Sequence, residues 1–324
     1  MQTLNQIQEI FERYLEVNKF DRYPPELYNP VNYILSLGGK RLRPAVLLMS
    51  HHLFDDQSEN ALPAAFAIEL FHNFTLMHDD IMDAAPLRRG KPTVHHKYGL
   101  NTGILSGDVM LVLAYEYLGR LHSPNREKIL DVFNRTAIEV CEGQQMDINF
   151  ETRLDVSIEE YLRMIELKTS VLVAAAMKIG ALTGGASDED AYAIYEFGRN
   201  LGIAFQLQDD LLDAYGDPEK FGKKVGGDIA QNKKTFLYLK ALEVADDSAK
   251  EHLKTLFSSS GAQENEKIEE VMQLFNRLKI KDLTEEEKQR FQTLAFENLE
   301  RVSVSKDKKI ILERFATALM QREF

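Results

Sequence analysis

Long apolar stretches with helical periodicity constrain the fold of this chain most. Between residues 61 and 83, apolar side chains recur every three or four residues, which is the period of an α-helix. This run is apolar on nearly all sides, as are 102–121 and 167–184, so each is expected to be a buried helix. The run 188–213 begins with acidic residues, which are common at helix starts. No alternating stretch of useful length indicates a strand, and the sequence predicts an all-α fold.

The chain organisation favours one domain over residues 1–324. Proline and glycine breaks are short, and nothing resembles a flexible linker between domains. The residues from about 284 onward have the pattern of charged amphipathic helices that cover the body of the protein. The longest apolar stretch, around 103–119, is interrupted by Asp108 and Glu116, so no transmembrane segment of about 20 apolar residues is expected.

Charge and cysteine content exclude several classes of function. The formal net charge is -12, which argues against general nucleic-acid binding. The single cysteine, Cys141, permits neither an intramolecular disulfide nor a cysteine zinc site. The first residues lack the basic and apolar segments of a secretory signal, and we expect a cytoplasmic protein.

Two acidic clusters carry the strongest functional signal. The stretches FTLMHDDIMD (74–83) and FQLQDDLLD (205–213) each close an apolar helical run with two adjacent aspartates and a third further on. The six residues are Asp79, Asp80, Asp83, Asp209, Asp210 and Asp213. In each trio the first and last aspartates share a helix face, and the second lies at their flank. One such cluster could equally be a solvated turn, but two at the ends of apolar helices favour magnesium, held jointly by carboxylates and a phosphorylated ligand.

Basic residues accompany the acidic clusters. Two glycines precede the cations of GGKRLRP (38–44), where they allow a close backbone approach to phosphate. Further basic residues follow the first cluster in PLRRGKPT and the second in FGKKVGGDIAQNKKT. Lys168 lies inside an apolar helical run, where it must either extend its ammonium to solvent or meet an anion. Each of these features is common by itself, and together they indicate an anionic ligand.

The order of these motifs resembles that of the trans-isoprenyl diphosphate synthases, or polyprenyl synthetases. The matching stretches, spread over roughly residues 35–240, are GGKRLRP, HNFTLMHDDIMD, RRGKPTVH, EGQQMD, LKTS, FQLQDDLLD and GGDIAQNKKT. The resemblance implies an all-α, isoprenoid-synthase-type bundle around a deep central cavity, and a homodimer. It also implies head-to-tail condensation of an allylic diphosphate with isopentenyl diphosphate.

The resemblance also assigns roles to individual residues. Both aspartate motifs would hold the allylic diphosphate through Mg²⁺, with Mn²⁺ as an alternative, and Asp79, Asp83 and Asp209 would be the main direct ligands. The residues expected to contact the allylic diphosphate are Arg88, Lys168, Lys224 and Lys233, with Lys223 as the alternative to Lys224. Those expected to bind isopentenyl diphosphate are Lys40, Arg43, His72 and Arg89. Thr169 and Gln206 would lie near the reacting carbons, and with Lys168 and Lys233 they form the expected catalytic set.

The resemblance also predicts the length of the product. In this family an aromatic residue five positions before the first motif partly closes the pocket for the growing chain, and Phe74 holds that position. Thr75 follows, where farnesyl enzymes of eukaryotes carry a second aromatic. The C20 product, geranylgeranyl diphosphate, is therefore expected, with the C15 farnesyl product as the alternative. The complete second motif argues against a terpene cyclase, and the six retained aspartates argue against a non-catalytic partner subunit.

Overall fold

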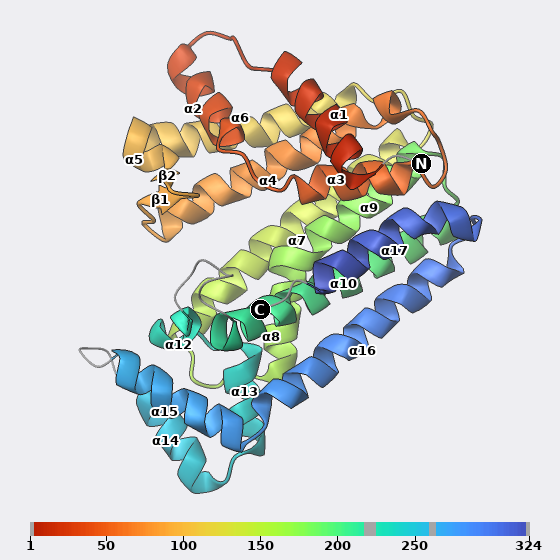
Figure 1. The fold of residues 1–324 in the computed structure, drawn as a ribbon. Helices are drawn as coiled ribbons and strands as arrows, with labels where there is room; N and C mark the ends of the chain where they lie inside the picture. The colour runs from red at the N-terminus through yellow and green to blue at the C-terminus, as the bar shows by residue number, and fades with distance from the viewer. Residues whose placement is uncertain (1–2, 217–224, 259–263, 322–324) are drawn as a thin grey trace. The chain divides into compact units, whose positions relative to one another are not determined.

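Helices dominate the computed structural model, which describes residues 3–216, 225–258 and 264–321 (Figure 1). The helical fraction is 79%, which confirms the predicted all-α class. Strands β1 (Leu87–Arg88) and β2 (Lys91–Pro92) form one small antiparallel hairpin. No helix among the described residues is both long enough and apolar enough to cross a bilayer.

The chain divides into two compact units, each built from several stretches of sequence. The first unit comprises Met1–Phe133, Ala176–Tyr192 and Ser303–Leu312. The second comprises Asn134–Ala175, Ala193–Val302 and Glu313–Phe324. The single domain expected for residues 1–324 stays a prediction.

The first unit is built around helix α4. Its complete elements are α1 (Leu4–Val17), α2 (Pro25–Ser36), α3 (Leu42–His51), a 3-10 turn (Ser58–Asn60), α4 (Leu62–Met82), α5 (Val94–Tyr98) and α6 (Leu100–Gly119). Helix α4 packs on α3 and lies alongside α6 (Figure 1). The fully buried Phe66 of α4 stacks on Phe20 and meets the ring of Tyr117 edge-on, with centroids 6.0 and 4.5 Å apart. This packing fixes α4, whose last turn carries the first aspartate motif.

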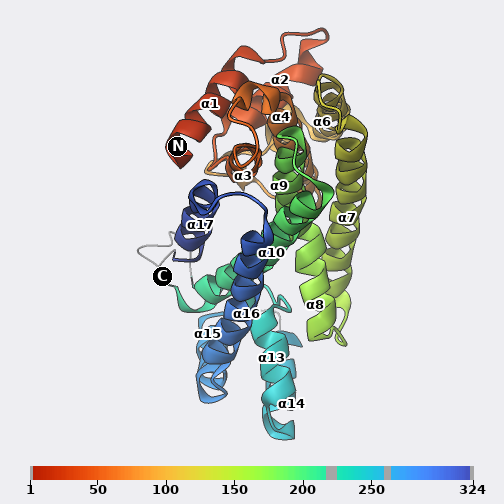
Figure 2. The same cartoon turned by 90° about the vertical axis from the view of Figure 1, so that its right-hand side faces the viewer.

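The second unit contains the second aspartate motif. Its complete helices are α8 (Ile158–Ile165), a π-helical turn (Glu166–Ser170), α12 (Gly227–Ala230), α13 (Phe236–Val244), α14 (Asp247–Ser258), α15 (Glu264–Arg277) and α16 (Ile280–Arg301). Four helices have residues in both units: α7 (Arg126–Thr152), α9 (Val171–Thr183), α10 (Asp188–Tyr215) and α17 (Lys306–Met320). Figure 2 shows α8 beside the C-terminal half of α7.

Local sequence explains where several helices begin and break. Ser157 caps α8 by accepting from the Glu160 backbone N–H, while the Glu160 side chain accepts from the Ser157 N–H, a reciprocal capping box. Helix α10 begins at Asp188, as the sequence predicts. The predicted helix over 167–184 starts instead as a π turn that continues into α9.

Candidate active site

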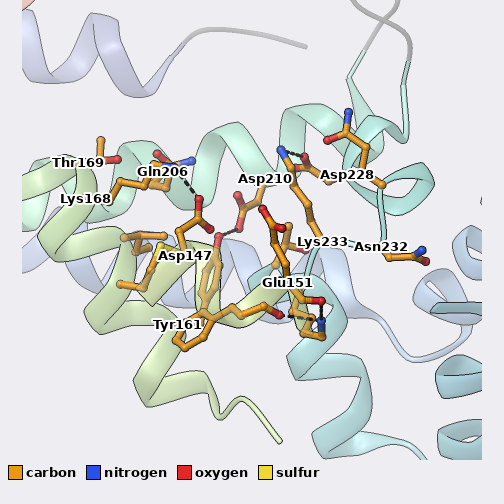
Figure 3. Close-up of a pocket in the computed structure, with 16 residues that line it drawn as sticks. Asp147, Glu151, Tyr161, Lys168, Thr169, Gln206, Asp210, Asp228, Asn232 and Lys233 are labelled. Carbon is orange, nitrogen blue, oxygen red and sulfur yellow. Dashed lines mark hydrogen bonds and ion pairs between the residues drawn. The ribbon is translucent and has the colours of Figure 1, made fainter. Parts of the chain in front are cut away.

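A pocket of about 440 Å³ in the second unit gathers most of the predicted residues of that unit (Figure 3). Its polar lining residues are Asp147, Glu151, Tyr161, Lys168, Thr169, Gln206, Asp210, Asp228, Gln231, Asn232, Lys233, Lys234 and Thr235. These side chains come from α7, α8, the π turn, α10, α12 and the segment between α12 and α13. Both lysines and carboxylates line the wall, so the pocket can bind an anion together with a cation.

The π turn presents Lys168 and Thr169 to this pocket. A β-carbon added to Gly143 of α7 would lie 2.3 Å from the backbone nitrogen of Lys168, so only glycine allows α7 to approach the turn this closely. One turn further along α7, Asp147 accepts an ion-paired hydrogen bond from the Lys168 ammonium at 2.5 Å. Gly143 and Asp147 therefore share one face of α7 and hold the widened turn by contact and by charge.

Asp147 is a site residue that the sequence-based assignment of roles left out. The motif EGQQMD could have pointed to Asp147, because its glycine, Gly143, and this aspartate are four residues apart and share a helix face. Tyr161 and Asp228 were likewise given no role, although both line the pocket.

The three aspartates of the second motif have different surroundings. Asp210 is only 5% exposed, and its Oδ2 accepts hydrogen bonds from the Tyr161 hydroxyl at 2.5 Å and the Phe236 backbone N–H at 3.4 Å. Asp213 accepts from the backbone N–H of Asp228 at 2.9 Å. Asp209 is half-buried. The motif thus connects α10 to the segments that follow it, as well as presenting carboxylates.

The adjacent lysines 233 and 234 have separate partners. Lys233 pairs with Asp228 at 3.0 Å, and its side chain is 58% exposed. Lys234 instead donates to the carbonyl oxygens of Phe150 and Glu151, in the last turn of α7, at 2.7 and 3.0 Å. Lys233 is therefore the better placed of the two to meet a ligand, and its role in binding stays a prediction.

Burial sets the protonation of the groups inside this pocket. It raises the pKa of Asp210 to about 8, although the hydrogen bond from Tyr161 acts in the opposite direction. Burial, followed by the charge of Asp210, raises the pKa of Tyr161 well above its usual range. Burial opposes the charge of Lys233, but Asp228 outweighs it and the pKa of Lys233 is raised.

In the first unit, the first aspartate motif ends α4 and meets the small hairpin. Asp83 caps the C-terminus of α4, with its backbone N–H bonded to the Asp79 carbonyl. Asp80 is 4% exposed and accepts from the Arg88 Nε at 2.7 Å. Arg88 ends β1, and the turn to β2 is made by Arg89 and Gly90, both with positive φ, the geometry of a tight hairpin turn.

The segment GGKRLRP is held by its middle arginine. Arg41 has left-handed backbone geometry (φ 44°), and its buried guanidinium pairs with Glu69 at 2.5 Å and with Glu12 at 3.1 Å. The flanking Lys40 is exposed, whereas Arg43 extends toward α4 and its Nη1 lies 3.0 Å from His72 Nε2. The structure thus places two predicted ligand residues, Arg43 and His72, in contact.

Gly39 brings the other predicted arginine to this group. A β-carbon on Gly39 would lie 2.8 Å from the guanidinium carbon of Arg89, and the φ of Gly39 is 133°. Burial, with Arg43 and Arg89 nearby, lowers the pKa of His72 well below its usual value, so the imidazole is neutral at pH 7. Burial also lowers the pKa of Arg43 to about 10, which leaves it charged. Arg43 and Arg89 thus form a cationic cluster around the neutral His72, which accepts a hydrogen bond from Arg43.

Phe74 and Thr75 lie on α4 within the same unit. The Phe74 ring is 5.6 Å from that of Phe71 and 4.8 Å from that of His78, between centroids. The Thr75 hydroxyl donates to the His72 carbonyl at 2.8 Å and is thereby turned back onto its own helix.

The predicted residues thus fall into two groups, one in each unit. The first-unit group contains Lys40, Arg43, His72, Phe74, Thr75, Asp79, Asp80, Asp83, Arg88 and Arg89. The second-unit group contains Lys168, Thr169, Gln206, Asp209, Asp210, Asp213 and Lys233. Lys224, like its alternative Lys223, lies outside the described residues. Across residues 3–216, 225–258 and 264–321, no three histidine, cysteine or acidic side chains form a ready-made metal cluster.

Comparison with known proteins identifies the family. A family model described as polyprenyl synthetase matches residues 24–275, which is most of the chain. The chain belongs to the polyprenyl synthetase family. A geranylgeranyl diphosphate synthase of Methanosarcina mazei is 50% identical to this polyprenyl synthetase over 222 residues, which are 68% of each chain. A crystal structure of a geranylgeranyl pyrophosphate synthase matches it with a TM-score of 0.94 and 47% identity, covering 100% of both chains.

Relatives with another named product also match this polyprenyl synthetase. A geranylfarnesyl diphosphate synthase of Natronomonas pharaonis is 42% identical over 242 residues, which are 69% of this chain and 71% of that one. Family membership confirms the predicted trans-prenyltransferase activity class. Members of the family use a divalent metal ion.

Proposed function

We propose that this polyprenyl synthetase condenses isopentenyl diphosphate head-to-tail with allylic diphosphates and that its main product is C20 geranylgeranyl diphosphate. The observation that carries the proposal is the pocket in which Lys168, Thr169, Gln206 and Lys233 surround the same space. Ammonium groups beside neutral polar groups suit a diphosphate that departs and leaves a carbocation behind.

The lysines of the second-unit pocket would bind the allylic diphosphate. Lys168 and Lys233 are each paired with a carboxylate, Asp147 and Asp228 respectively, so both ammonium groups are held at the pocket wall before substrate arrives. Their charges stabilise the negative charge that grows on the departing diphosphate. The Thr169 hydroxyl and the Gln206 amide supply dipoles near the allylic carbons, where positive charge develops.

The cationic cluster of the first unit suits isopentenyl diphosphate. Arg43 and Arg89 offer forked donors for phosphate oxygens, and the neutral His72 orients Arg43 by accepting its hydrogen bond. Lys40 is exposed beside them. Arg88, which is paired with Asp80, is assigned to the allylic diphosphate.

Magnesium fits the donor chemistry of both aspartate motifs. Mg²⁺ prefers carboxylate and phosphate oxygens and uses few protein ligands, so a few aspartates together with a diphosphate would suit it. We propose Asp79, Asp83 and Asp209 as its direct ligands, with Mn²⁺ as an alternative metal. When bound, the metal would supply positive charge to the diphosphate.

The proposed product length rests on Phe74. Its ring is backed by Phe71, which in turn lies 5.3 Å from the ring of Phe133, so an aromatic layer supports it. A supported ring would stop the growing chain at C20. The C15 product remains the alternative, and we also propose a homodimeric, cytoplasmic enzyme.

A product assay tests the proposal. Purified protein, Mg²⁺ and isopentenyl diphosphate are incubated with the C5, C10 or C15 allylic diphosphate, and the products are sized by mass spectrometry. We expect C20 from each primer, no turnover after Asp79→Ala, and products of C25 or longer after Phe74→Ala. If the products end at C15, residues other than Phe74 must limit the length of the chain. Absence of magnesium-dependent condensation with all three primers would refute the synthase and favour a partner subunit.

A further inference from the structure

Tyr161 and Asp210 form a buried contact in the wall of the second-unit pocket (Figure 3). The tyrosine hydroxyl donates to Asp210 Oδ2 at 2.5 Å, and the two residues are only 4% and 5% exposed. Because both partners are so deeply buried, the loss of this hydrogen bond leaves a polar group without compensation.

The same oxygen of Asp210 also holds the start of α13. The Phe236 backbone N–H, at the first residue of that helix, points at Asp210 Oδ2 from 3.4 Å. One carboxylate oxygen therefore connects α8, which carries Tyr161, to α10 and α13. Phe236 follows Lys233 by three residues, so this contact ends the segment that presents Lys233 to the pocket.

Other contacts restrain the same segment from its other sides. Lys234 binds the carbonyl oxygens that end α7, and Lys267 of α15 binds the Asn232 side chain. The Lys233 backbone N–H donates to the Asp228 carbonyl at 2.9 Å. With Phe236 held by Asp210, the backbone is fixed on both sides of Lys233, while its side chain remains largely exposed.

We propose that Tyr161 and Asp210 are positioning residues that anchor residues 232–236 and thereby place Lys233. This assignment separates Asp210 from its neighbour Asp209, which has the same side chain in the same motif. It rests on the proposed function, because it concerns the same pocket. Both hydrogen bonds use Asp210 Oδ2 and neither uses Oδ1. The test therefore also measures whether Asp210 affects the Mg²⁺ requirement.

The test compares Tyr161→Phe, Asp210→Asn and Asp209→Asn with the wild-type protein. The control is Tyr192→Phe, which removes the hydroxyl of a tyrosine that is 59% exposed. Thermal unfolding is measured without metal, in the presence of a chelator. The KM for the allylic primer and the Mg²⁺ concentration for half-maximal rate are measured at saturating isopentenyl diphosphate.

We expect Tyr161→Phe to lower the midpoint of metal-free unfolding by roughly 3 °C or more and to raise the primer KM several-fold. Asp210→Asn keeps an oxygen that can accept both hydrogen bonds, so its Mg²⁺ requirement should match that of the wild type. Asp209→Asn should raise that requirement about tenfold or more and should not lower the metal-free midpoint.

Two results would overturn the inference. One is a Mg²⁺ requirement that rises as much in Asp210→Asn as in Asp209→Asn. The other is a Tyr161→Phe protein whose midpoint and primer KM match those of the Tyr192→Phe control. If the wild-type protein shows no condensation, the proposed function fails by itself, and the metal-free unfolding of the variants still decides whether the anchor exists.

Discussion

His72 Nε2 lies 3.0 Å from Arg43 Nη1, and the imidazole is the acceptor in this contact. A guanidinium can only donate, so the histidine must carry its proton on Nδ1. Burial, followed by the charges of Arg43 and Arg89, lowers the pKa of His72 well below its usual value. Protonation would add another cation to the cluster and break the hydrogen bond.

This contact predicts a pH dependence of stability. The unfolded chain binds a proton at His72 below about pH 6.5, whereas the folded protein resists it, so His72 reduces stability as the pH falls below that value. The slope from this one group is at most about 1.4 kcal/mol per pH unit. We expect His72→Gln to flatten the dependence of the free energy of unfolding between pH 7 and 5, as measured by urea titration. His122→Gln, at an exposed histidine, is the control, and equal slopes for both variants would contradict the prediction.

A second prediction concerns the buried pair of Arg41 and Glu69. Both side chains are 4% exposed, so removing one charge leaves the other buried without its partner. We expect Arg41→Met to lower the free energy of unfolding by about 3–5 kcal/mol, and the double variant with Glu69→Leu to recover a substantial part of that loss. Arg41→Met should also raise the KM for isopentenyl diphosphate, since Arg41 holds the backbone between Lys40 and Arg43. A double variant no more stable than the single one would argue against this interpretation.

The close approach of α7 to the π turn gives a third prediction. Gly143→Ala would place a methyl group 2.3 Å from the Lys168 nitrogen, and the turn that carries Lys168 and Thr169 must shift. We expect kcat/KM for the allylic primer to fall by about 100-fold. The matched control is Gly119→Ala in α6, where an added β-carbon has no neighbour within 4 Å, and its kinetics should remain those of the wild type. Wild-type kinetics in Gly143→Ala would refute the prediction.

The neighbouring lysines provide a fourth, paired prediction. Lys233→Ala should raise the KM for the allylic primer about tenfold or more with little change in stability, because the Lys233 side chain is 58% exposed and its ion pair with Asp228 contributes little. Lys234→Ala should leave the primer KM nearly unchanged. It should lower the free energy of unfolding by about 1 kcal/mol, because it removes the hydrogen bonds to the last carbonyl groups of α7. Steady-state kinetics and chemical denaturation of the two variants check this contrast. The same pattern in both would show that their separate partners do not matter.

The sequence by itself determined the helical class and the positions of the functional motifs. The period of apolar residues around Phe66 and Phe71 is a local property, and it suffices to predict a buried helix that ends at Asp79–Asp83. The family resemblance, read from the motifs, singled out Lys233, which lines the second-unit pocket. These features depend on a residue and its near neighbours, which a sequence shows directly.

The tertiary structure decided how chemically identical residues differ. Asp209 and Asp210 are adjacent, yet Asp210 is held by Tyr161 from another helix and by the first N–H of α13. The π turn at Lys168 depends on Gly143, which is far away in sequence and permits the contact with α7. Such differences arise from contacts between distant segments, and a local pattern contains no information about which segment will supply the partner.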